Sequence, residues 1–182
     1  MYKMIQTQTN NYPSKLLQSN TTSLFITIPQ TTIDYEILHN NLAEFKHTKY
    51  LITKLEQHED GGLHIHILIM LKATIRISAI HSIIIQQQGT IKGLIDYDKI
   101  KHLAKTINYI KKTDTSVEDK PYLEFGQLSD RIQQQVGSLN LALLDAIQKA
   151  NDGNIDDAMQ DIKNIDPMKY LIHKQVIKEY RS

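Results

Sequence analysis

The sequence contains no cysteine. Disulfides, thiolate zinc sites and cysteine nucleophiles are therefore all excluded. Any metal ion must be bound by histidine, carboxylate and water ligands, which favours Mg²⁺, Mn²⁺ or a similar ion over structural zinc. Strong charge of one sign is also missing, because the net charge is only +1. This balance excludes a grossly basic nucleic-acid coat protein but permits a local basic patch.

The sequence also lacks a long apolar run and the pattern of a signal peptide. We therefore expect a soluble intracellular protein without a membrane-spanning segment. Its 182 residues and hydrophobic content of 41% are enough for one domain with a proper core, together with a small helical appendix.

The chain alternates β-rich runs with helical patterns up to about residue 128 and carries only helical patterns after that. We expect a flexible leader (1–22), a main domain (23–128) and a helical segment (129–182). The expected strands are 24–28, 50–56, 63–70, 90–95 and 122–126, and the expected helices of the main domain are 32–46, 75–88 and 98–112. This order predicts an α+β fold, in which a central antiparallel sheet of about five strands (ferredoxin- or RRM-like) carries packed helices.

The apolar run Leu63–Met70 is interrupted by two histidines, His64 and His66. In a strand both imidazoles point to one face, while the alternate apolar residues point to the core. The glycine-rich turn before the run predicts a hairpin, and a turn centred near Asp60 pairs Glu56 with His64 on the same face. Glu56, His64 and His66 form either an open site for a divalent ion or an ion pair on a solvated face.

A second candidate feature is the helix expected at 98–112. Tyr109 and Lys112 are three residues apart and share one face, which Lys105 extends. Between residues 92 and 112 there are six lysines and two aspartates. A tyrosine beside lysines suits attack on a phosphate or binding to one. The alternative is a half-buried tyrosine among solvated lysines.

The order of these features resembles the HUH-endonuclease domain of the replication initiator (Rep) proteins of circular single-stranded DNA viruses (geminiviruses, circoviruses and nanoviruses) and related rolling-circle plasmids. Glu56 stands eight residues before His64, where these proteins place their carboxylate ligand. The segments that carry the resemblance are Phe25-Ile26-Thr27-Ile28-Pro29-Gln30 (first motif), His64-Ile65-His66 (second motif), Tyr109-Ile110-Lys111-Lys112 (the Tyr-x-x-Lys third motif) and Tyr122-Leu123-Glu124-Phe125-Gly126 (the closing strand).

The resemblance implies a metal-dependent, sequence-specific endonuclease and nucleotidyltransferase that nicks and rejoins single-stranded DNA at an origin stem-loop. Glu56, His64 and His66 would bind Mn²⁺ or Mg²⁺, which would polarise the scissile phosphate. Tyr109 would attack the phosphorus, release a 3′-hydroxyl and remain as a 5′-phosphotyrosine. Lys112 would position the DNA backbone or stabilise charge in the transition state.

Single-stranded DNA is expected across the sheet face. Gln30 is a candidate contact taken from the first motif, and Lys54, Lys92 and Lys105 are candidates from their charge. Residues 129–182 resemble the helical segment that promotes oligomerisation and leads to a helicase. Because the sequence has no G-x-x-x-x-G-K-[ST] loop, we expect an N-terminal fragment or a helicase-free relative. The resemblance implies a host nucleus for a eukaryotic virus or plasmid, and the cytoplasm for a bacterial plasmid.

Other classes remain open. Single-tyrosine transposases share the order of histidines before tyrosine, whereas conjugative relaxases, which the order argues against, place the tyrosine first. A non-catalytic RNA- or DNA-binding module has the same architecture, although the histidine strand has none of the aromatic residues that such modules use. A structural oligomerisation protein that relies on residues 129–182 is the third alternative.

Overall fold

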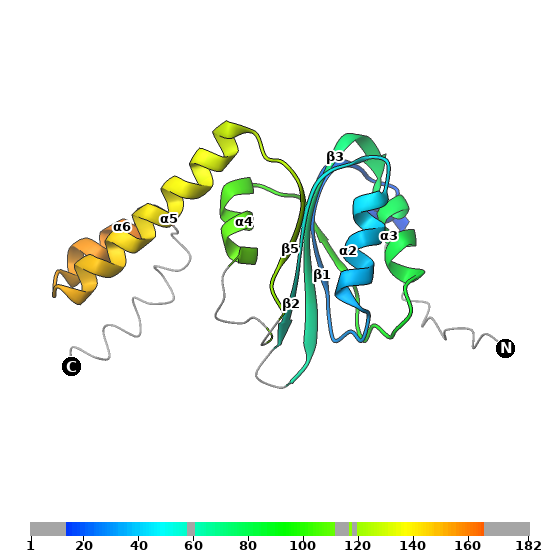
Figure 1. Cartoon of the computed structure of the whole chain (residues 1–182), viewed down its shortest axis with the longest axis horizontal. Helices are drawn as coiled ribbons and strands as arrows, with labels where there is room; N and C mark the ends of the chain where they lie inside the picture. The colour runs from blue at the N-terminus through cyan, green and yellow to red at the C-terminus, as the bar shows by residue number, and fades with distance from the viewer. Residues whose placement is uncertain (1–13, 58–60, 112–116, 118–119, 166–182) are drawn as a thin grey trace. The chain divides into compact units, whose positions relative to one another are not determined.

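The computed structural model describes residues 14–57, 61–111, 117 and 120–165 (Figure 1). The chain divides into two compact units, Met1–Leu128 and Ser129–Ser182. No helix in the described ranges is both long enough and apolar enough to cross a membrane.

The first unit is built on a five-stranded sheet with the order β4-β1-β3-β2-β5, in which every neighbouring pair is antiparallel. The strands and helices of this unit are α1 (Ser14–Leu17), β1 (Asn20–Ile28), α2 (Tyr35–Glu44), β2 (Thr48–Gln57), β3 (Leu63–Arg76), α3 (Ile77–Ile85), β4 (Asp96–Asp98), α4 (Leu103–Lys111) and β5 (Leu123–Gly126). The succession β1-α2-β2-β3-α3-β4 is the ferredoxin-like arrangement, to which β5 is added beside β2. The predicted α+β fold is confirmed.

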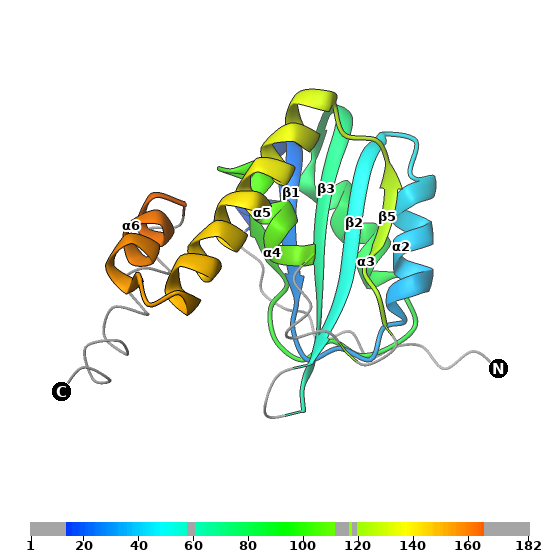
Figure 2. The same cartoon turned by 60° about the vertical axis from the view of Figure 1, so that its left-hand side comes forward.

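The two faces of the sheet are covered by different helices. Helices α2 and α3 lie on one face and α4 lies on the other (Figures 1 and 2). Because side chains alternate along a strand, every second residue of β1, β2 and β3 points to α2 and α3. These residues form the main core with apolar side chains of the two helices, and the strand members are Leu24, Ile26, Ile28, Leu51, Leu55, Ile65, Ile67, Ile69 and Leu71. The intervening residues of the same strands therefore face α4.

Two histidines serve the fold on the side of α2 and α3. The Nδ1 atom of His39 lies 3.0 Å from the Thr53 hydroxyl, and Nδ1 of His81 lies 2.7 Å from the Tyr97 hydroxyl. Burial lowers the pKa of both imidazoles below the usual 6.5, because desolvation disfavours the charged form. Both histidines are therefore neutral hydrogen-bonding groups at neutral pH.

The connection from α3 to α4 differs from the sequence prediction. The strand expected at 90–95 is wrong, because Ile91 makes only an isolated bridge to Thr31 and the strand beside β1 is Asp96–Asp98. The helix expected from Asp98 begins instead at Leu103, since Asp98 pairs with Phe25 inside the sheet. The spacing of apolar residues gave the approximate positions of the strand and the helix. It did not show which residues would pair with the free edge of β1.

The flexible leader expected at 1–22 is also wrong for its last nine residues. Residues 14–17 form α1, and β1 begins at Asn20, where it pairs with Arg76 at the end of β3. Thr21 and Thr22 are β-branched and fit a strand once such a partner exists. β3 runs to Arg76, beyond the expected end at residue 70, and this extension supplies the partner.

The second unit is described from 129 to 165. Helices α5 (Asp130–Asn151) and α6 (Ile155–Ile165) pack on each other after a turn in which Gly153 has φ 84°. Lys149 of α5 binds Asp145 at 2.8 Å and Asp161 of α6 at 2.7 Å. Residues 166–182, the rest of the expected helical segment, lie outside the described residues.

Gly126, in β5, is the glycine of the sheet at which a side chain should be least tolerated. It has φ 81°, and a Cβ atom there would collide with the carbonyl oxygen of Lys49 in β2. We expect Gly126→Ala to lower the free energy of unfolding by about 3 kcal/mol or more. Gly61 is the matched control, because its φ is 80° but nothing lies within 4 Å of the added Cβ, so Gly61→Ala should cost only about 1 kcal/mol. Equal losses in urea unfolding would contradict the close approach of β5 to β2.

Candidate active site

The β2–β3 hairpin sets the candidate ligands on the face that α4 covers. Glu56 is the cross-strand partner of His64, and Lys54 is the partner of His66. The predicted pairing of Glu56 with His64 is therefore confirmed. Glu56 Oε2 lies 3.1 Å from His66 Nε2, and both residues are buried. The intervening Ile65 is fully buried on the opposite face, so the core holds this register.

His66 is held by three other side chains. Its Nδ1 lies 3.2 Å from the Thr27 hydroxyl, while its Nε2 faces Glu56. The ring of Phe25 stacks on the imidazole with centroids 5.5 Å apart and planes inclined by 8°. Thr27 is the direct partner of His66 in the β1–β3 register, and Phe25 lies two residues away on the same face. These contacts fix the plane of the ring and direct Nε2 to the carboxylate.

One carboxylate and two imidazoles form a donor set that suits a divalent cation with open coordination positions. As the side chains stand, no three His, Asp or Glu residues in the described ranges converge on a single ion position. Glu56 and His66 are bonded to each other instead. Ligand atoms at right angles around an ion with bonds of about 2.1 Å are about 3.0 Å apart. The 3.1 Å between Glu56 Oε2 and His66 Nε2 matches that spacing, so these two of the three candidate donors are compatible with one divalent ion.

Helix α4 brings Tyr109 to the same place. The Tyr109 ring meets the rings of His66 and Phe25 edge-on, with centroid distances of 5.7 and 6.0 Å. Ile107 and Ile110 are fully buried, and α4 packs on β2 and β3 of the sheet. By contrast, 41% of Tyr109 is exposed. The structure thus brings a solvent-accessible phenol together with the buried Glu56–His66 pair.

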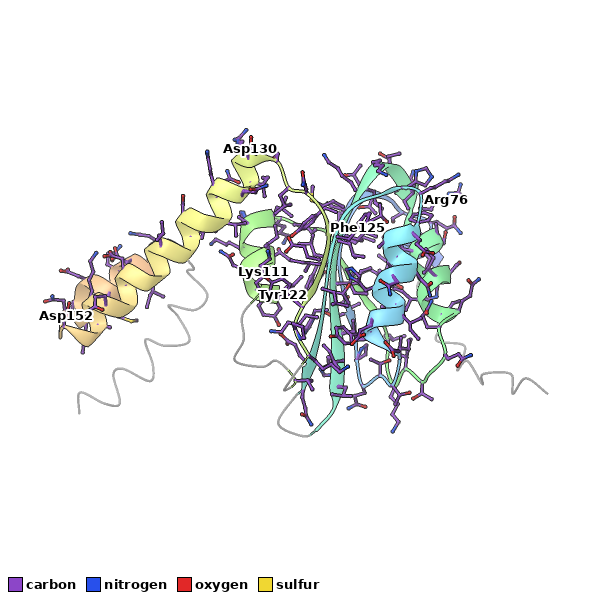
Figure 3. All side chains as sticks on the ribbon, in the orientation of Figure 1. Arg76, Lys111, Tyr122, Phe125, Asp130 and Asp152 are labelled. Atoms are coloured by element: carbon purple, nitrogen blue, oxygen red, sulfur yellow. The ribbon has the colours of Figure 1, made fainter. Side chains whose placement is uncertain are left out.

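The last turn of α4 is anchored to β5. Lys111 Nζ binds Glu124 Oε2 at 2.9 Å and lies 5.1 Å from the centre of the Tyr122 ring (Figure 3). The other oxygen of Glu124 accepts a hydrogen bond of 2.5 Å from the buried Tyr50 hydroxyl. Burial, together with this bond, raises the pKa of Tyr50 above its usual range. The ammonium of Lys111, two residues after Tyr109 on α4, is thereby connected to the sheet.

Two other predicted contacts lie on two neighbouring loops beside the site, one after β1 and one between α3 and β4. Gln30 is exposed and has φ 41°, and its carbonyl accepts a hydrogen bond of 3.2 Å from the backbone N–H of Lys92. The next residue, Thr31, donates its N–H to the carbonyl of Leu63 at 2.9 Å. Gln30 and Lys92 therefore lie near the start of β3, next to the strand that carries both histidines.

Lys105 lies on α4, four residues before Tyr109 and on the same side of the helix, and is partly exposed. Lys112, the predicted helper of Tyr109, lies outside the described residues. The described part of the third motif therefore ends at Lys111.

Lys54, which was predicted from its charge to contact DNA, is not at the surface of this structure. Only 1% of Lys54 is exposed, and its Nζ lies 3.2 Å from Glu56 Oε1. The physical reason is its position on the inner part of the sheet, with its side chain on the face that α4 covers.

Phe25 and Thr27 were not predicted as site residues, although both stand in the first motif. Alternation along Leu24–Ile28 would have placed them together on the face opposite the core. The sequence did not show that β3 would lie beside β1 with Thr27 against His66. Knowledge of that register would have identified Phe25 and Thr27 as neighbours of His66.

The family described as the geminivirus Rep catalytic domain matches residues 17–125. The matched range contains Glu56, His64, His66 and Tyr109, and it runs from the end of α1 almost to the end of β5. No curated protein matches the sequence.

The Glu124 connection yields a prediction about stability. Glu124→Leu should cost about 1–3 kcal/mol in urea unfolding, because it leaves the buried Tyr50 hydroxyl without its acceptor. Adding Tyr50→Phe should recover part of that loss. Lys111→Met removes a partly exposed ion pair and the contact with the Tyr122 ring, and should cost less than about 1 kcal/mol. A loss from Lys111→Met as large as that from Glu124→Leu would contradict this ranking.

Proposed function

Because the chain belongs to the geminivirus Rep catalytic domain family, we propose that it initiates rolling-circle replication by nicking single-stranded DNA with Tyr109 and later rejoining the strand. The observation that carries this proposal is the contact between the rings of Tyr109 and His66, because the Nε2 atom of His66 faces Glu56. A nucleophile and a candidate cation site lie on one face of one sheet. The family match favours an initiator over a single-tyrosine transposase.

The proposed step is a transesterification. The phenolic oxygen of Tyr109 attacks the phosphorus of the scissile phosphodiester, and the bond from phosphorus to the 3′ oxygen breaks. The 3′ oxygen leaves and takes up a proton, while the 5′ phosphate stays on the tyrosine. The new diester is close in energy to the old one, so a later 3′-hydroxyl can attack it and rejoin the strand without ATP.

The main chemical obstacle is the proton of the phenol. A phenol with a pKa near 10 is ionised to about one part in a thousand at neutral pH, which corresponds to about 4 kcal/mol. Tyr109 is exposed on one side and touches the rings of His66 and Phe25 on the other. Positive charge near the phenolic oxygen would offset part of this cost, and the proposed sources are the cation site and Lys112.

We propose that Glu56, His64 and His66 hold Mg²⁺ or Mn²⁺. When bound, the ion supplies positive charge that polarises the phosphoryl oxygens and favours the phenolate. Thr27 and Phe25 fix the imidazole of His66 from two directions, so that its Nε2 is already directed to the carboxylate. This preorganisation lowers the cost of bringing the donors together.

The DNA would approach from the exposed side of Tyr109. Lys105 shares the helix face of Tyr109, and Gln30 and Lys92 lie on two hydrogen-bonded loops beside the start of β3. Phosphate contacts by lysine release counterions, so binding to an origin stem-loop should weaken as salt rises. The helices of the second unit are proposed to support self-association.

The nucleophile is tested by Tyr109→Phe on a labelled origin-like single strand with Mn²⁺. We expect cleavage to fall at least about a thousandfold, because the attacking oxygen is removed, while DNA binding changes little. Tyr122→Phe is the matched control, since Tyr122 is similarly exposed but lies against Lys111 at the end of α4. Undiminished cleavage by Tyr109→Phe would overturn the assignment.

The proposed ligands are tested by cation removal and substitution. We expect EDTA to abolish cleavage and Mn²⁺ or Mg²⁺ to restore it. His66→Ala and His64→Ala should each weaken Mn²⁺ binding at least about tenfold in calorimetry, because each removes a donor. His102→Ala, which alters an exposed histidine before α4, should leave binding unchanged. Unaltered affinity in both His64 and His66 variants would place the cation elsewhere.

A further inference from the structure

Lys54 is a cation buried inside the candidate metal site. Its exposed fraction is 1% and that of Glu56 is 3%, and the two side chains meet at 3.2 Å. Lys54 is also the cross-strand partner of His66. Lysine is almost never fully buried unless it is paired, because its ammonium loses its hydration.

The fold alone does not require this charge. A buried ion pair is often no more stabilising than apolar residues of similar volume, since desolvation offsets the attraction. Neighbours of Lys54 on the same face include apolar residues such as Ile52 and Leu68. A methionine would therefore satisfy packing at this position. Packing does not explain the charge of Lys54, so we look for its role in the candidate metal site.

The carboxylate of Glu56 is shared between Lys54 and His66. One carboxylate oxygen faces the ammonium of Lys54 at 3.2 Å, and the other faces Nε2 of His66 at 3.1 Å. A divalent cation that takes Glu56 as a ligand must compete with the ammonium for the same carboxylate. It must also share a buried region with a like charge, where repulsion is screened far less than in water.

On the basis of the proposed function, we propose that Lys54 is the residue that sets the affinity of the site for divalent cations. Its ammonium balances and positions the Glu56 carboxylate before the cation binds. It then opposes the bound cation, which keeps affinity low and exchange fast. Lys54 is a positioning residue in this account, because it acts through Glu56 and not on the DNA.

The direct test is titration of Mn²⁺ into the Lys54→Met variant. Binding is measured by calorimetry and by the electron paramagnetic resonance signal of free Mn²⁺. Methionine keeps most of the length of lysine and removes its charge. We expect the dissociation constant to fall at least about tenfold relative to the wild type. Lys54→Gln, a second neutral variant, should shift it in the same direction, and this protects the test against a packing defect in either variant.

Lys49→Met is the matched control. Lys49 lies on the same strand but is exposed, so its substitution should leave Mn²⁺ affinity unchanged. A second readout is the rise in melting temperature on adding Mn²⁺, which should be larger for Lys54→Met than for the wild type, because tighter binding to the folded state stabilises it more.

The outcomes separate the two proposals. If the wild type binds Mn²⁺ and both neutral variants bind no tighter, the inference about Lys54 is overturned while the proposed function stands. Weaker binding by both variants would likewise overturn it, since Lys54 would then assist the cation. If no form of the protein binds Mn²⁺, the cation part of the proposed function fails together with the inference.

Discussion

The candidate site depends on the register between β2 and β3. Glu56 and His66 meet because a hairpin of fixed register sets Glu56 against His64 and Lys54 against His66. A slip of one residue would turn every side chain of one strand to the other face. Such a slip would move Ile65, Ile67 and Ile69 out of the core. The same apolar residues that stabilise the sheet therefore hold the polar cluster in place.

The site is built on the face opposite the main core. Helices α2 and α3 cover the side on which the long apolar strands are buried, and α4 covers the other side with a mixed layer of rings, carboxylates and ammonium groups. Three elements that are distant in sequence contribute: β1 supplies Phe25 and Thr27, the hairpin supplies its polar residues, and α4 supplies Tyr109. Polar chemistry on one face and apolar packing on the other allow a buried ion pair without interrupting the core.

The sequence was sufficient where the physics is local. Alternation along a strand and the length of one turn gave the shared face of His64 and His66 and the partner Glu56. It failed where an outcome depends on a distant partner. The burial of Lys54 depends on α4, which comes much later in the chain and covers this face, and the stacking of Phe25 on His66 requires the β1–β3 register. The start of α4 was misplaced because Asp98, a good helix cap, was taken by the edge of β1.

The central claim is that Tyr109 becomes joined to DNA. The most direct measurement is mass spectrometry of peptides from the protein after incubation with origin-like single-stranded DNA and Mn²⁺. We expect a nucleotide adduct on the peptide that contains Tyr109, and loss of that adduct when His66 is replaced by alanine. An adduct on another of the nine tyrosines, or cleaved DNA without any adduct, would contradict it.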